Sequence, residues 1–102
     1  MADIYKKRTI NAIYKSLNDR AKVKCKGRFP DSPNDFQVCY HQAMADNART
    51  LASKLRAQLG TCRNTINPIR CKKQIINLVK YMEQQQGEHE NHVDQLHDLR
   101  EE

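Results

Sequence analysis

Residues Pro68–Leu99 decide the fold, and they read PIRCKKQIINLVKYMEQQQGEHENHVDQLHDL. Side chains that recur at alternating steps of four and three residues lie on one stripe of an α-helix. In this stretch the stripe comprises Cys71, Ile75, Leu78, Met82, Gln85, His89, His92, Leu96 and Leu99. The stripe is apolar at its start, polar in its middle and apolar again at its end. The pattern predicts a third helix, whose first half packs in a core.

The start of this third helix is predicted by Asn67 as a cap and Pro68 in the first turn. Gly87 interrupts it, and a glycine inside a helix costs about 1 kcal/mol relative to alanine. The helix is therefore predicted to end near Gln86 and restart, or to bend there. On this basis the chain divides into a basic bundle domain, residues 1–86, and an acidic, histidine-bearing helical tail, residues 87–102.

A first helix is predicted from about Asp3, a capping residue, to Lys24. Gly27 and Pro30 are expected to end it and to leave a loop from Cys25 to Asp31. One face of this helix is apolar at the helical period. Its members are Ile10, Ile13, Tyr14, Leu17 and Ala21.

A second helix is predicted after Ser32, whose hydroxyl is a capping group ahead of Pro33. It is expected to reach Leu59 and to stop at Gly60 in the left-handed conformation. No window alternates apolar and polar residues as a half-buried strand does. The predicted fold is all-α: an antiparallel three-helix up-down-up bundle with a C-terminal helical extension, stapled by two disulfides.

The disulfides follow from where the helices place the cysteines. About twenty helical residues, or ~30 Å, separate Cys39 from Cys62, whereas a disulfide needs Cα atoms about 4.4–6.8 Å apart. An antiparallel bundle also puts Cys39 and Cys71 at opposite ends, so only Cys25–Cys39 and Cys62–Cys71 remain of the three pairings. Four buried, reduced thiols are the alternative. The same separation excludes a zinc site of four cysteines.

Paired cysteines indicate an oxidising compartment, so we expect a periplasmic or secreted protein, with the cytoplasm as the alternative. The sequence contains no apolar run of the ~18 residues that a transmembrane helix needs. No cofactor and no metal are predicted.

Charge is distributed unevenly along the 102 residues, although the net charge is +6. Residues 1–80 hold seventeen of the eighteen Lys and Arg and five of the twelve Asp and Glu, whereas residues 81–102 hold one base and seven acids. Outward-facing bases recur every seven residues. They form a predicted basic surface of Arg8, Lys15, Lys22, Lys73 and Lys80. This surface indicates a protein or anionic macromolecule as partner, and an ordinary solvated face is the simpler alternative.

The tail has three interpretations. The first is an assembly seam, through which the C-terminal helix forms a homodimer or binds a partner, and which weakens when its histidines become charged in acid. Its residues are His89, His92, Val93, Leu96 and Leu99. The second is a surface site for a divalent ion at Glu88, His89 and His92. The third is a polar, partly frayed end.

No motif indicates catalysis. The three glycines lie apart and cannot form a phosphate loop, and Cys39 and His41 are two residues apart, which does not place them on one helix face. We therefore expect no enzyme, but a small binding or regulatory module that acts through helix surfaces on another macromolecule. Two alternatives remain open: a cytosolic basic nucleic-acid-binding protein with reduced cysteines, and a metal-dependent helical module.

Overall fold

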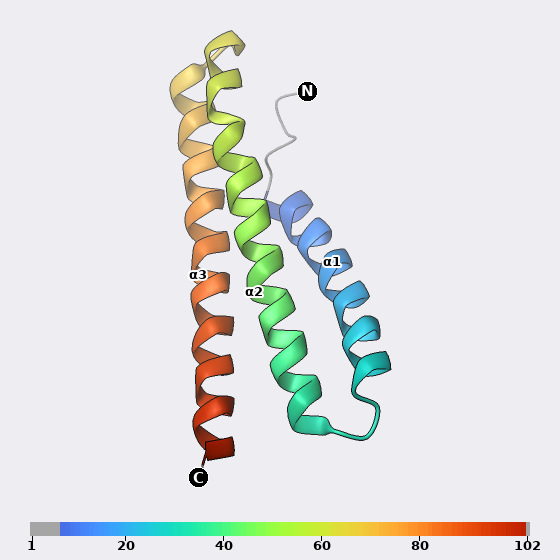
Figure 1. Cartoon of the computed structure of the whole chain (residues 1–102). Helices are drawn as coiled ribbons and strands as arrows, with labels where there is room; N and C mark the ends of the chain where they lie inside the picture. The colour runs from blue at the N-terminus through green and yellow to red at the C-terminus, as the bar shows by residue number, and fades with distance from the viewer. Residues whose placement is uncertain (1–6, 102) are drawn as a thin grey trace.

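The structure, a computed structural model, describes the backbone of residues 7–101 and the side chains of residues 7–97. Three α-helices alternate in direction along an elongated molecule of 54 × 24 × 17 Å (Figure 1). The elements in chain order are α1 (Lys7–Arg28), α2 (Pro33–Ala57), the 3₁₀ helix η1 (Leu59–Asn64) and α3 (Pro68–Glu101). This arrangement confirms the predicted all-α, up-down-up bundle with two disulfides.

The core lies mainly between α2 and α3, which run side by side along the length of the molecule (Figure 1). Ile75 and Met82 of α3 are fully buried, and Ala48 of α2 is buried beside them. Each large apolar side chain contributes roughly 1.5–3 kcal/mol through burial. The apolar half of the α3 stripe is buried throughout, as predicted: Cys71, Ile75, Leu78 and Met82.

α1 is shorter and packs mainly against α2 (Figure 1). Ile10 and Tyr14 enter the shared core, but Ile13 is 44% exposed, which corrects its predicted burial. Because α1 has few contacts with α3, its buried stripe is narrower than a helix with two full neighbours requires.

Polar contacts fix the position of α1 along α2. The Tyr14 hydroxyl donates to the carbonyl of Met44 at 3.4 Å. The buried Asn18 accepts from the Asn47 amide at 3.1 Å. These paired groups meet the requirement that buried polar atoms be hydrogen-bonded.

α1 continues past the predicted end at Lys24 and stops at Arg28. The Phe29 amide donates to the Cys25 carbonyl at 3.0 Å and closes the last turn. Gly27 does not break the helix: it lies inside α1, and its φ is not positive. Pro30 is the effective stop, since it disfavours helical geometry at the residue before it. The proposed cap, Asp3, lies outside the described residues.

α2 ends at Ala57, two residues before the predicted Leu59. The chain tightens into η1, where the Gln58 amide donates to the Leu55 carbonyl at 3.0 Å. Gly60 lies inside η1 and has no positive φ, so the predicted left-handed stop is wrong. The tighter turn instead carries Cys62 towards α3.

The two proline starts differ in their caps. The Ser32 hydroxyl does not cap α2, because it donates to the Asp35 carboxylate at 2.7 Å instead. Pro33 does open the helix, as predicted. At α3 the predicted cap is confirmed, since the Arg70 amide donates to Asn67 Oδ1 at 3.1 Å.

α3 runs without interruption through Gly87, so the predicted end near Gln86 is wrong. A Cβ added at Gly87 would have no neighbour within 4 Å. Val93, beyond the glycine, is only 5% exposed. Side-chain burial on both sides of Gly87 therefore outweighs its poor helix propensity. The division at residues 86 and 87 stays a prediction about domain organisation.

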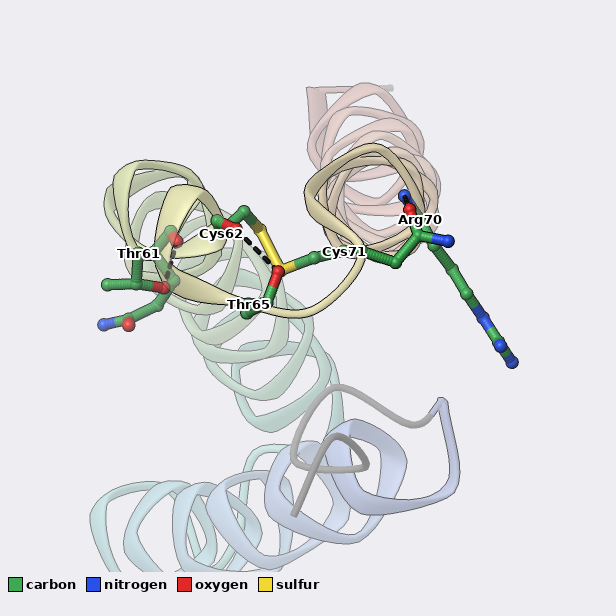
Figure 2. Close-up of a disulfide and its surroundings, with 7 residues drawn as sticks. Thr61, Cys62, Thr65, Arg70 and Cys71 are labelled. Carbon is green, nitrogen blue, oxygen red and sulfur yellow. Dashed lines mark hydrogen bonds between the residues drawn. A yellow bond between two sulfur atoms is a disulfide. The ribbon is translucent and has the colours of Figure 1, made fainter.

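Both predicted disulfides are formed. Their Cα–Cα distances are 5.7 Å for Cys25–Cys39 and 5.5 Å for Cys62–Cys71. The first joins α1 to α2, and the second joins η1 to the first turn of α3 (Figure 2). Each therefore fastens one helix–helix connection, and the pairs are consistent with an oxidising compartment. Within residues 7–101, no helix has the length and apolar character needed to cross a membrane.

Removing either disulfide should destabilise the bundle. The bonds close segments with separations of 14 and 9 residues, and the chain-entropy model assigns each roughly 3 kcal/mol. We expect Cys62→Ala/Cys71→Ala, and separately Cys25→Ala/Cys39→Ala, to lower the free energy of unfolding by about this amount in urea titrations. Non-reducing peptide mapping checks the pairing, and a Cys39–Cys62 peptide would contradict the bundle.

Replacing the helical glycine of α3 should stabilise the protein. Because Gly87 has open space around its Cβ position, Gly87→Ala is expected to raise the free energy of unfolding by about 0.5–1 kcal/mol. The matched control is Gly27→Ala in the last turn of α1, where the gain should be smaller. A loss of stability in Gly87→Ala would show that the helix is not regular at this point.

Candidate functional site

Three histidines from α2 and α3 meet between the two helices. His41 Nδ1 lies 3.0 Å from His89 Nδ1, so one nitrogen donates and the other accepts. The ring centroid of His41 lies 4.1 Å from that of His92 and 5.2 Å from that of His89. We refer to His41, His89 and His92 as the histidine cluster.

The hairpin geometry explains why these residues meet. His41 lies 21 residues before Cys62, and His92 lies 21 residues after Cys71. Two antiparallel helices that start from one disulfide rise equally, so residues at equal distances from it come opposite each other. The equal spacing from the two cysteines is present in the sequence, but the sequence prediction relates His41 only to Cys39 and not to the tail histidines.

Two members of the cluster, His41 and His89, are biased towards their neutral forms. Burial, together with positive charge on His92 and His89, lowers the pKa of His41 from 6.5 to about 4. Burial also lowers the pKa of His89, while the neighbouring Glu88 carboxylate opposes that shift. Proton uptake by these rings therefore works against the packing of α2 on α3.

Neutral imidazoles are common metal ligands. Among the described side chains, however, no group of three or more His, Cys, Asp and Glu could hold a metal ion. His89, which the sequence placed in a surface ion site with Glu88, hydrogen-bonds to His41 instead.

The predicted assembly seam is partly buried within the molecule itself. Val93 is buried and His89 and Leu96 are half-buried, whereas His92 is exposed. The Leu99 side chain lies outside the described ones. Because Val93 is already buried in the single chain, the Val93 side chain is not accessible to a second copy in this conformation. Association through the remaining seam residues stays a prediction.

The predicted basic surface is exposed on two elements. Arg8, Lys15 and Lys22 are exposed on α1, and Lys73 and Lys80 are exposed on α3. Whether the two groups act as one surface stays a prediction.

The α1 part of this surface is longer than predicted, because Lys26 follows Lys22 by four residues and is also exposed. We name Arg8, Lys15, Lys22 and Lys26 the cationic stripe. α1 carries eight Lys and Arg against one acid, Asp19. The ion pairs described within residues 7–97 join Arg49 to Asp46 and Arg56 to Glu83, and neither uses a cation of α1.

A cleft of about 540 Å³ lies between the end of α1 and the start of α2. The Cys25–Cys39 disulfide, Phe29 and Val38 contribute to its wall. The Arg28 guanidinium lies over the Phe29 ring at 5.4 Å from its centroid. No sequence motif indicates this cleft, because it depends on the angle between two helices.

Comparison with protein-family models, with curated proteins and with solved structures found no match. Function is therefore inferred from the burial, charge and geometry of the described residues.

Acid should destabilise the protein through His41. The unfolded side chain binds a proton near pH 6.5 and the folded one only near pH 4. Between these values the unfolded state binds more protons, so stability falls as the pH falls. We expect the melting temperature to drop from about pH 7 to about pH 5, and the drop to shrink in His41→Gln.

His97→Gln is the matched control, because His97 is an exposed histidine of α3 outside the histidine cluster. It should keep the drop seen in the parent protein. Equal drops in His41→Gln and the parent would exclude His41 as the source of the acid sensitivity.

Proposed function

We propose that the protein is a small, non-enzymatic binding module that holds an anionic macromolecule on the cationic stripe of α1, in the periplasm or outside the cell. The observation that carries this proposal is the stripe itself. Four exposed bases recur along one side of a helix whose other side is buried on α2.

The charge on α1 supports an anionic partner. Seven net positive charges follow from its eight bases and one acid. No described ion pair neutralises them. Unneutralised charge of one sign attracts an oppositely charged partner over long range and raises the association rate.

The attachment of α1 supports a preorganised surface. The Cys25–Cys39 disulfide fixes one end of α1 to α2, and the Asn18–Asn47 hydrogen bond fixes its middle. A surface that is already ordered loses less conformational entropy when it binds. The long lysine side chains still adapt to the spacing of the partner's charges.

The test compares two charge-matched variants on a heparin column, used as a sulfated polyanion probe. Lys15→Gln/Lys22→Gln removes two charges from the stripe. Arg20→Gln/Lys24→Gln removes two charges from other sides of the same helix. We expect the first variant to elute at clearly lower salt than the second, because released counterions make polyanion binding depend on the number of charge contacts.

Both variants replace exposed side chains, so circular dichroism should show unchanged helix content in each. Equal elution of the two variants would mean that only the total charge matters, and the stripe would not be a binding surface.

The compartment is tested separately. Thiol titration of denatured protein from its native source should find no free cysteine. Four free thiols would favour the cytosolic nucleic-acid-binding alternative instead.

A further inference from the structure

Exposed isoleucines and lysines alternate on the outer side of α3, near its start. Ile66 is fully exposed, Ile69 is 81% exposed and Ile76 is 42% exposed. From Ile69, steps of four, three and four residues reach Lys73, Ile76 and Lys80, so these side chains lie on one helix face. We name Ile66, Ile69, Lys73, Ile76 and Lys80 the isoleucine–lysine strip.

The charge around the strip has one sign. Residues 47–82 contain eight Lys and Arg and no Asp or Glu. Arg70 and Lys72, next to the strip, are exposed, and Figure 2 shows the Arg70 side chain extending away from the disulfide. The surface is therefore apolar and cationic together.

The strip starts at a free end of the molecule. Figure 1 shows the turn between α2 and α3 at one end of the long axis, beyond the start of α1. An approaching flat surface can therefore reach this turn without meeting α1.

We propose that the isoleucine–lysine strip docks on an anionic lipid surface, with Ile66 and Ile69 entering the interface and the lysines binding lipid head groups. Apolar side chains flanked by Lys and Arg are the pattern of helices that lie in a membrane interface. Cations near anionic lipid strengthen that contact. A nucleic acid would gain little from the isoleucines, because bases stack on aromatic side chains.

Several polar groups at the turn already have hydrogen-bond partners within the protein. The Thr61 hydroxyl donates to the Gln58 carbonyl, and the Thr65 hydroxyl donates to the Cys62 carbonyl, both at 2.6 Å (Figure 2). Asn67 Oδ1 accepts from the Arg70 amide. Polar groups that already have partners cost less to move out of water.

This docking surface goes beyond the proposed function, since it uses α3 and the turn before it rather than the cationic stripe of α1. Either proposal can fail without the other.

The test uses tryptophan as a reporter, because the chain has none of its own. Ile66→Trp is mixed with phosphatidylcholine vesicles with and without phosphatidylserine. Val23→Trp is the control, since Val23 is 74% exposed on α1. A blue-shifted emission is expected only for Ile66→Trp with phosphatidylserine. No shift, or equal shifts in both variants, would overturn the proposal.

Vesicle sedimentation then measures affinity. Ile66→Ser/Ile69→Ser should weaken binding by on the order of tenfold per isoleucine that enters the interface. Lys73→Gln/Lys80→Gln should weaken vesicle binding more than Lys15→Gln/Lys22→Gln. The second variant is the charge-matched control, because it removes two lysines from the cationic stripe of α1 instead. The lipid assignment would be overturned if vesicle binding did not depend on the isoleucines. It would also be overturned if the protein bound duplex DNA through Lys73 and Lys80 and did not bind vesicles.

Discussion

The register between α2 and α3 is the constraint on which most of the structure depends. Cys62 and Cys71 hold the start of this hairpin together, with their Cα atoms 5.5 Å apart. Residues at equal sequence distances from this disulfide, one on α2 and one on α3, therefore lie opposite each other. The same register buries Ile75 and Met82 and brings His41 to the tail histidines. Covalent closure and apolar packing thus specify one alignment, which is how a chain of 102 residues obtains a stable hairpin.

A two-helix core has a second consequence, because it leaves faces uncovered. α3 packs on α2 and η1 but has little contact with α1. Its outer face near Ile69 therefore meets no other helix in the part of the chain that the structure describes, and the isoleucines there remain exposed. α1, attached on one side only, likewise presents most of its circumference to solvent. Both candidate binding surfaces follow from this open arrangement.

Spacing arguments predicted the large features well. The rise of a helix per residue excludes Cys39–Cys62, because a separation of ~30 Å cannot be closed by local adjustment. The antiparallel arrangement of the helices then excludes Cys39–Cys71, and the structure confirms the two remaining pairs. Local propensities were less reliable. Gly27, Gly60 and Gly87 were all wrong as predicted helix stops, because the poor helix propensity of one glycine is small beside the packing of the residues around it. The histidine cluster required a helix register, and the α1–α2 cleft required a helix angle. The sequence pattern of one segment predicts neither the register between two helices nor the angle between them.

The two disulfides also determine what a protease can do to the molecule. The turn between α1 and α2 lies inside the segment that Cys25–Cys39 closes, residues 25–39, and the second part of the α2–α3 connection lies inside the segment that Cys62–Cys71 closes, residues 62–71. Exposed turns are where chains are usually cut, and Lys26, Arg28, Arg63 and Arg70 are exposed there. A cut inside either closed segment would leave the fragments covalently joined and the helices in place. For cuts inside these two segments, nicking and dissociation are therefore separate events, and a helix is released only when reduction follows cleavage.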